Sequence, residues 1–199
     1  MDARSALKPI FLSAGIPDPK RNPKYYGTMD SFAIREAVSA LTMVVTPAAK
    51  LIFGGHPAVS PFVYQTAKAM NAVDNVVIYQ SEFFRSQVPK ESLAFNQIVW
   101  TTDHGDVPKS LEMMRGQMIG NHQDVAGVFI GGMEGIEDEC AMFRAHHPSA
   151  TVLPIASTGA AARILFDCNE GPTDKATRDL LEREHLYQWL FRKLLGIQP

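Results

Sequence analysis

Residues 127–139 read GVFIGGMEGIEDE: a short apolar run, a glycine-rich turn and then the acidic start of a helix. An apolar run of this length is typical of a β-strand that helices cover on both faces. The same order of strand, small-residue turn and helix recurs along the chain, as it does in proteins with a parallel sheet. The sequence therefore predicts an α/β, Rossmann-like domain with a mostly parallel sheet of about six strands and helices on both faces. The expected strands span residues 9–13, 50–53, 76–79, 98–101, 127–130 and 152–155.

Helices are expected between these strands. Apolar side chains recur at helical spacing through residues 31–45 and form one stripe. Ser60 is a suitable N-cap, and Pro61 suits the first helical position, where its missing N–H costs nothing. The remaining helices are expected over residues 108–119, 137–145 and about 174–195, with a long loop over 16–28 and a short helix plus a covering loop within 80–96.

Length and composition limit the class of protein. The chain has 199 residues, 46% of them hydrophobic and 20% charged, which suits a single domain over residues 1–199 with a real core. A net charge of −2 without a basic block argues against a long nucleic acid as partner.

The expected compartment is the cytoplasm. Cys140 and Cys168 form no disulfide-like framework, which fits a reducing environment. Residues 1–7 are charged and precede only about four apolar residues, too few for a signal peptide. No run approaches the ~18 apolar residues that would cross a bilayer, so no membrane association is expected.

Several familiar catalytic signatures are absent. The sequence has no GxxxxGK[ST], GxGxxG, HExxH or GxSxG motif and no His/Cys cluster with metal-ligand spacing, so neither a metal nor a cofactor is expected. What remains are four turns rich in glycine or hydroxyl groups, each at the carboxyl end of an expected strand. They lie at residues 13–15, 54–57, 131–135 and 157–159.

These four turns predict a ligand with phosphate or ribose. In an open parallel sheet, ligands bind at the carboxyl ends of the strands. Glycine lets the backbone approach a phosphate, and the helix that follows offers free N–H groups. The alternative is that each turn only needs a positive φ. The candidate ligand-binding residues are Ser13, Gly15, Gly54, Gly55, His56, Gly131, Gly132, Glu134, Gly135, Thr158 and Gly159.

The turns at residues 54–55 and 131–139 resemble the SLOG superfamily. Its members include the "lonely guy" phosphoribohydrolases, the DNA-processing Smf-type proteins and ligand-sensing domains of bacterial antiviral systems. The enzymes carry PGGxGTxxE, and this chain has GGxxGIxxE, with one extra residue, Ile130 for proline and Ile136 for threonine. Met114, Arg115 and Met118 are similar to the helix that carries the enzymes' arginine. The similarity covers residues 9 to about 166.

The resemblance implies two kinds of function. In an enzyme, Arg115 and Glu139 would be the catalytic pair, and Glu139 would stabilise positive charge on the ribose as an N-glycosidic bond breaks. Alternatively, Glu139 only complements a helix dipole and Arg115 lies on the surface. The enzymes continue the second turn as GGxxGLMG, whereas here His56 and Pro57 follow the glycines, which favours a nucleotide sensor over a phosphoribohydrolase or N-glycosidase.

A third hypothesis is that the protein is an assembly subunit with a vestigial pocket. The expected terminal helix has an apolar stripe wider than one sheet-facing surface needs, and SLOG relatives commonly form dimers or larger assemblies. A homo-oligomer is therefore expected, and the residues of the stripe include Tyr187, Trp189, Leu190 and Phe191.

Overall fold

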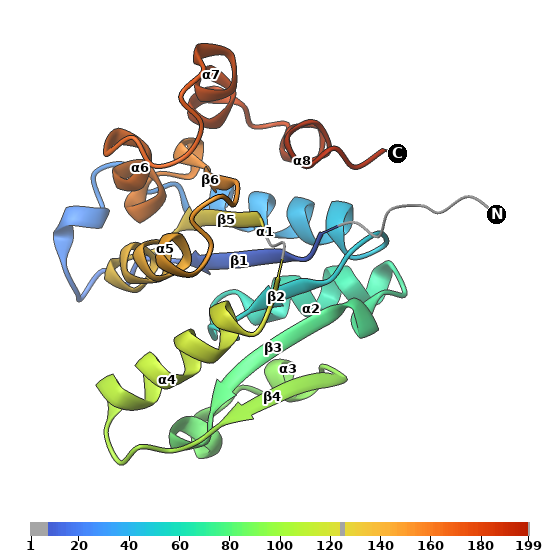
Figure 1. Cartoon of the computed structure of the whole chain (residues 1–199), viewed down its shortest axis with the longest axis vertical. Helices are drawn as coiled ribbons and strands as arrows, with labels where there is room; N and C mark the ends of the chain where they lie inside the picture. The colour runs from blue at the N-terminus through green and yellow to red at the C-terminus, as the bar shows by residue number, and fades with distance from the viewer. Residues whose placement is uncertain (1–7, 124–125, 199) are drawn as a thin grey trace.

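The computed structural model describes residues 8–123 and 126–198. The charged segment 1–7 lies outside the described residues. Six strands form one sheet in the order β4-β3-β2-β1-β5-β6, and every neighbouring pair is parallel, which confirms the predicted fold class (Figure 1). The strands are β1 (Ile10–Gly15), β2 (Leu51–Phe53), β3 (Val76–Ser81), β4 (Gln97–Thr101), β5 (Ala126–Gly131) and β6 (Val152–Pro154).

Helices connect the strands and cover both faces of the sheet. The helices α1, α2 and α8 pack on one face, and α4, α5 and α6 pack on the other (Figure 1). The helices are α1 (Ser31–Val45), α2 (Ser60–Ala69), α3 (Lys90–Leu93), α4 (Val107–Gly120), α5 (Glu134–His146), α6 (Ala160–Asp167), α7 (Lys175–Arg183) and α8 (Tyr187–Leu195). Short 3-10 helices are η1 (Pro23–Tyr25), η2 (Val73–Asn75), η3 (Glu82–Gln87) and η4 (Ala156–Thr158).

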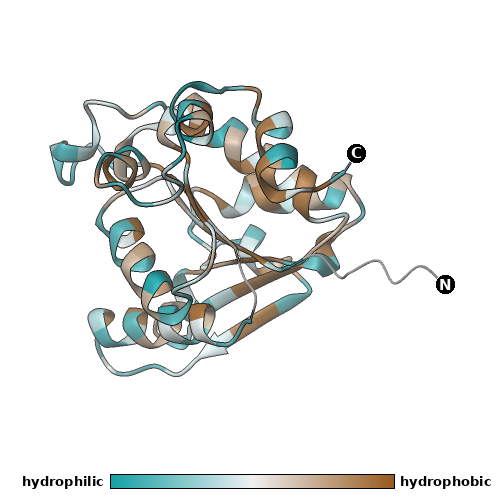
Figure 2. Cartoon of the chain, turned by 45° about the horizontal axis from the view of Figure 1, so that its top comes forward, coloured by the Kyte–Doolittle hydropathy of each residue, from teal (hydrophilic) through white to brown (hydrophobic). Residues whose placement is uncertain are grey.

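The hydrophobic core lies on both sides of the sheet. Figure 2 shows the strands and the inward faces of the helices as the most hydrophobic parts of the chain. On the α4–α5–α6 face, Phe11, Phe129 and Phe143 form an aromatic cluster with ring centroids 5.4 to 6.0 Å apart. Because both faces are buried, the strands are nearly continuous apolar runs, and this is why they were visible in the sequence.

The order of the strands creates a switch point beside β1. The chain moves from β1 through β4 in one direction and then returns to place β5 on the other side of β1. The connections on the two sides of β1 therefore diverge and leave a crevice above its carboxyl end, where ligands bind in folds of this class. In the described part of the chain, no helix is both long enough and apolar enough to cross a membrane.

Two helix boundaries differ from the prediction. Val59 is the N-cap residue of α2, and the Ser60 hydroxyl instead donates to the His56 carbonyl at 3.1 Å. The helix expected over residues 137–145 begins earlier, at Glu134, because the glycine turn ends at Met133. The first turn of α5 therefore lies at the carboxyl ends of the strands, next to Gly132.

The single helix expected over residues 174–195 is in fact two helices, α7 and α8. Glu184 has an extended backbone with ψ 131°, and its carboxylate accepts hydrogen bonds from the N–H groups of His185 and Leu186. A side chain that bonds the following backbone in this way competes with helical hydrogen bonding. Leu190 and Phe191 of α8 are fully buried, so most of the wide apolar stripe is used within one copy of the chain.

Candidate functional site

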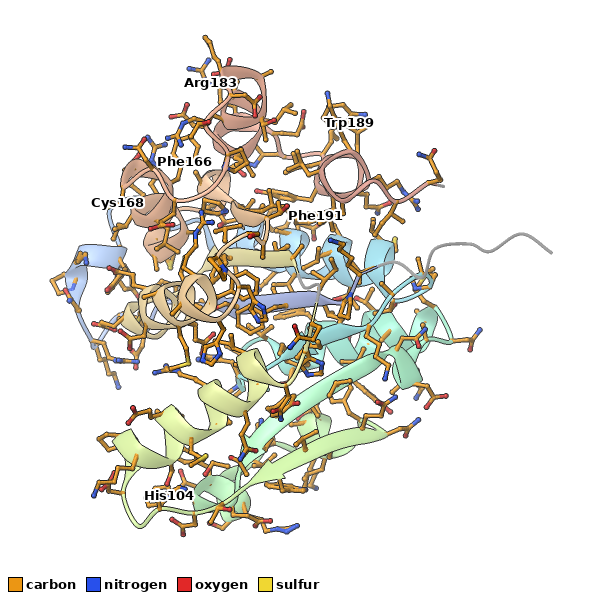
Figure 3. The ribbon with its side chains drawn as sticks, viewed as in Figure 1. His104, Phe166, Cys168, Arg183, Trp189 and Phe191 are labelled. Atoms are coloured by element: carbon orange, nitrogen blue, oxygen red, sulfur yellow. The ribbon has the colours of Figure 1, made fainter. Side chains whose placement is uncertain are left out.

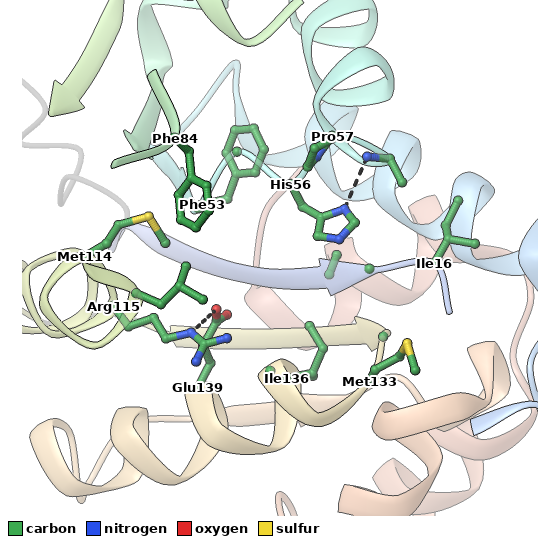
Figure 4. A pocket seen from close by; sticks show the side chains of 18 of the residues that line it. Ile16, Phe53, His56, Pro57, Phe84, Met114, Arg115, Met133, Ile136 and Glu139 are labelled. Carbon is green, nitrogen blue, oxygen red and sulfur yellow. Dashed lines mark hydrogen bonds and ion pairs between the residues drawn. The ribbon is translucent and has the colours of Figure 1, made fainter. Parts of the chain in front are cut away.

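A pocket of about 680 Å³ opens at the carboxyl ends of β1, β2 and β3, between the first turn of α5, the inner side of α4 and the loop after β2 (Figure 4). This volume suits a small organic ligand. The predicted residues that line it come from separate turns and helices that the fold brings together. They are Gly15, Gly54, Gly55, His56, Arg115, Gly132, Gly135 and Glu139.

An ion pair lies in the wall of the pocket (Figure 4). The Nε of Arg115 donates to Oε1 of Glu139 at 3.1 Å, and the Ser13 hydroxyl donates to Oε2 of the same carboxylate at 2.6 Å. The side chains of Arg115 and Glu139 are only 18% and 14% exposed. Burial raises the pKa of Glu139, and the nearby Arg115 and Ser13 oppose this rise without cancelling it.

Arg115 and Glu139 come from two different helices, α4 and α5, that line the pocket. Met114 and Met118 are buried against the sheet and hold α4 in place, so that the adjacent Arg115 reaches across to α5. Glu139 is in the second turn of α5, while Gly135 is in the first turn, below the guanidinium. A Cβ on Gly135 would lie 2.6 Å from Nη2 of Arg115, so the missing side chain leaves room for the arginine.

His56 lines the pocket and is hydrogen-bonded through one of its two ring nitrogens. Its Nδ1 accepts a hydrogen bond from the N–H of Ala58 at 3.2 Å, which assigns the proton of the neutral ring to Nε2. The ring lines the pocket and is reached by solvent from there. Desolvation by the surrounding protein lowers the pKa of His56, and the charge of Arg21 lowers it further. The lowered pKa favours the neutral ring, whose Nε2–H group is a hydrogen-bond donor.

Sequence reasoning missed the residues that make one end of the pocket apolar. Phe53, Phe84 and Met114 gather on one side of the pocket in Figure 4, away from His56 and Met133. Phe53 is the last residue of β2, and Phe84 comes from η3 in the segment expected only to cover the sheet. Phe53 could have been found from the sequence, because it is an aromatic residue at the end of an expected strand.

Gln80 was also missed, although a polar residue near the end of an apolar strand is unusual. Its Nε2 donates to the carbonyls of Gly54 at 3.3 Å and Gly55 at 3.1 Å, which ties the turn after β2 to β3. Gly55 has φ 61°, and a Cβ there would collide with the Gln80 amide. The glycine and the glutamine therefore fix the shape of this wall together.

The loop over residues 16–28 closes the pocket near α5. Arg21 lines the pocket and pairs with Glu134 at 3.2 Å. Lys24 pairs with Glu137 at 3.1 Å, and the Tyr25 hydroxyl donates to the same carboxylate at 2.6 Å. Burial and this hydrogen bond raise the pKa of Tyr25 above its usual range. These contacts hold the loop against the acidic first turns of α5.

Other predicted residues do not line the pocket. The Ser13 hydroxyl is bonded to Glu139, and the Glu134 carboxylate faces Arg21. Gly131 and Thr158 are joined to each other: the buried Thr158 hydroxyl accepts from the N–H of Gly131 at 3.0 Å and donates to the Ile155 carbonyl at 2.6 Å. Gly159 packs against the backbone of Thr28. The turn at residues 157–159 thus connects parts of the fold to one another.

The fold and the site define an α/β protein of the Rossmann type with a pocket at its topological switch point. The chain belongs to the SLOG cluster3 family, whose model matches residues 24–195. This finding confirms the resemblance to the SLOG superfamily, and the match includes Arg115, Glu139 and the glycine turns after β2 and β5. A search of curated proteins found no match to the chain.

Proposed function

We propose that this protein binds a nucleotide-derived small molecule, such as a nucleoside phosphate or an NAD or ADP-ribose derivative, and acts as a ligand sensor. The observation that carries the proposal is the division of the pocket. Phe53, Phe84 and Met114 form an apolar end. At the other end, beside Ile16, Met133 and Ile136, the polar groups are those of Arg21, His56 and the first turn of α5 (Figure 4). Membership of the SLOG cluster3 family is consistent with a nucleotide-related function.

The two ends suit the two ends of a nucleotide. A planar base would pack against the aromatic side chains of Phe53 and Phe84. The polar end would receive phosphate, because the first N–H groups of a helix have no partner within the helix and favour an anion. The ribose would then lie over Arg115 and Glu139, between the two ends.

Charge limits how phosphate would be held. The charged residues that line the pocket are Asp18, Arg21, Arg115 and Glu139, and their formal charges cancel. Arg115 is already paired with Glu139, and Arg21 with Glu134. A phosphate would therefore depend on backbone N–H groups, on the Nε2 donor of His56 and on Arg21 exchanging Glu134 for the ligand.

Differential scanning fluorimetry and calorimetry with AMP, GMP, NAD, ADP-ribose and cyclic ADP-ribose test the proposal. At least one of these ligands is expected to raise the Tm of the wild-type protein. Gly135→Ala should weaken binding of that ligand roughly ten- to hundredfold, because the new Cβ displaces the Arg115 guanidinium. Its effect on folding should be smaller than that of removing the guanidinium, because the flexible Arg115 side chain can shift while it stays beside Glu139, and alanine suits a helix better than glycine does.

Gly116→Ala is the matched control. Gly116 lies in α4, next to Arg115, and a Cβ there meets nothing within 4 Å. This variant should bind like the wild type and gain about 0.5–1 kcal/mol of stability. A flat response of the wild type to the whole panel contradicts the proposal and favours an assembly subunit with a vestigial pocket. Equal binding by both variants contradicts the placement of the ligand beside Arg115.

His56 gives an independent prediction. His56→Asn keeps an acceptor near Ala58 but is too short to reach the ligand, so affinity should fall by roughly tenfold with little loss of stability. His56→Gln places an amide donor near the Nε2 position but loses the bond from Ala58, so stability should fall by about 1 kcal/mol with a smaller loss of affinity. Titration calorimetry and thermal unfolding separate the two effects, and the opposite ranking of affinities contradicts the donor role.

A hydrolase is the second candidate, because a buried carboxylate lies where the ribose would be. Glu139 would stabilise positive charge on the glycosidic carbon, and Arg115 would keep the carboxylate ionised and oriented. Incubation with the same nucleotides and chromatography for the free base tests this function. Turnover that falls at least about hundredfold in Glu139→Gln supports the enzyme, and ligand binding without turnover assigns the pocket to sensing.

A further inference from the structure

The sheet has two edges, and the chain protects only one of them well. At the β6 edge the strand is three residues long, ends in Pro154 and is fully buried. A Cβ on Gly171 would lie 2.8 Å from Pro154 and 2.9 Å from the Val152 carbonyl, so the segment after α6 packs directly on this strand. Short length, proline and a covering segment are the usual ways in which an edge strand is kept from pairing with another chain.

The β4 edge is less protected, although the Arg85 guanidinium lies 4.2 Å from the centroid of the Trp100 ring. The strand is five residues long, and its first four residues, Gln97–Trp100, are all half-exposed. Residues 92–102 contain no charged residue, no proline and no glycine. Figure 1 shows β4 at the margin of the sheet, beyond β3. A half-exposed edge strand with no charged residue of its own is a template for one more strand.

The pattern of polar and apolar residues in β4 is the same in both directions: Gln97 and Thr101 are polar, and the three residues between them are apolar. In an antiparallel pair centred on Val99, Gln97 faces Thr101 of the other copy and Ile98 faces Trp100, twice each by symmetry. Ile98 packs on the α2 side of the sheet and Val99 on the α4 side. Residues that face each other across antiparallel strands share a side, so two isoleucine–tryptophan pairs and a central Val99 pair would form, and neither strand contributes a charged residue to them.

We propose that two copies of this chain pair through β4, antiparallel and about a two-fold axis at Val99, so that their sheets join into one. A second copy fits this edge because a two-fold interface requires a surface that is complementary to itself. This proposal is independent of the proposed function. It also differs from the homo-oligomer expected through the terminal helix, where Trp189 is 46% exposed and points away from the sheet, while Phe191 points toward it (Figure 3).

A charge exchange at Val99 tests the pairing on the full chain. Wild-type protein should sediment as a dimer in analytical ultracentrifugation. Val99→Lys and Val99→Glu should each raise the dissociation constant on the order of hundredfold, because like charges meet at the two-fold axis. An equimolar mixture of the two variants should recover a dimer, and this recovery excludes misfolding as the cause of dissociation.

Three outcomes would overturn the proposal. Wild-type protein that stays monomeric at about 100 µM leaves the edge to an extended segment of another protein. A dimer that both Val99 variants retain, but that Trp189→Glu dissociates, places the interface on α8. Variants that dissociate but do not associate when mixed show that Val99 acts within one copy. In circular dichroism, the folded state of each variant should match that of the wild type.

Discussion

Gly159→Ala is expected to destabilise the protein by about 4 kcal/mol or more, with a fall in Tm of roughly 10 °C or more. Gly159 has φ 71° and ψ −159°, a region of backbone conformation that is essentially restricted to glycine. A Cβ there would collide with the Thr28 carbonyl and lie 2.9 Å from the N–H nitrogen of Met29. Because backbone cannot move aside as a flexible side chain can, the segment before α1 would separate from η4 and α6.

The segment before α1, residues 28–30, makes further contacts with η4 and α6 that would be lost if it separated from them. The N–H of Asp30 donates to the Thr158 carbonyl at 3.3 Å, and the Thr28 hydroxyl accepts from the N–H of Ala160 at 3.0 Å. Asp30 also caps α1 by accepting from the N–H groups of Phe32 and Ala33. The start of α1 is thus tied to the turn at residues 157–159, so strain at Gly159 should spread to it.

Gly105→Ala is the matched control, measured by thermal and urea unfolding alongside Gly159→Ala. Gly105 also has a positive φ, 80°, but a Cβ there meets nothing within 4 Å. The loss should be only about 1–2 kcal/mol, or roughly 2–8 °C in Tm, from backbone strain alone. Equal losses in the two variants would mean that the contact with Thr28 contributes nothing and that only the positive φ matters.

Arg115→Met is expected to destabilise the protein by about 3 kcal/mol at pH 7.5, because it leaves the Glu139 carboxylate in the pocket wall without its cation. The loss of unfolding free energy relative to the wild type should be smaller at pH 5 than at pH 7.5. Burial already raises the pKa of Glu139, and removal of Arg115 raises it further above that of the unfolded chain. The folded variant then binds more protons than the unfolded chain, so its stability falls as pH rises through the folded pKa.

The double variant Arg115→Met/Glu139→Gln should recover most of this stability at pH 7.5. It contains no unpaired charge, and the Ser13 hydroxyl can still donate to the substituted amide oxygen. Urea unfolding of the wild type, both single variants and the double variant at pH 5 and 7.5 measures the coupling. A loss in Arg115→Met that is the same at both pH values would contradict the role assigned to the Glu139 charge.

Sequence reasoning located the strands well and the helix ends less well. The strands are buried on both faces, so each shows as an apolar run that depends on no distant residue. The division between α7 and α8 was hidden, because Glu184 ends α7 through its own side chain and the apolar spacing continues past it. The Ser60 hydroxyl was predicted to cap α2, but it bonds the His56 carbonyl instead.

The pair Arg115 and Glu139 shows what the family resemblance added to the residues themselves. The two residues are 24 positions apart on different helices, and their spacing alone does not place them together. Their positions in motifs similar to those of SLOG proteins suggested that they meet, and the packing of α4 beside α5 brings the Nε and Oε1 atoms to 3.1 Å. Phe84 and Gln80 had no motif to mark them.

The sequence by itself determined the α/β class and the presence of glycine turns at strand ends, because burial and backbone freedom leave a local pattern. Only the tertiary structure decided which turns reach the pocket. The turns after β1, β2 and β5 line it because these strands are neighbours at the switch point. The turn at residues 157–159 follows the outer strand β6, where Gly159 meets Thr28 and the Thr158 hydroxyl binds Gly131. A glycine looks the same in sequence whether a ligand or another part of the chain lies against it.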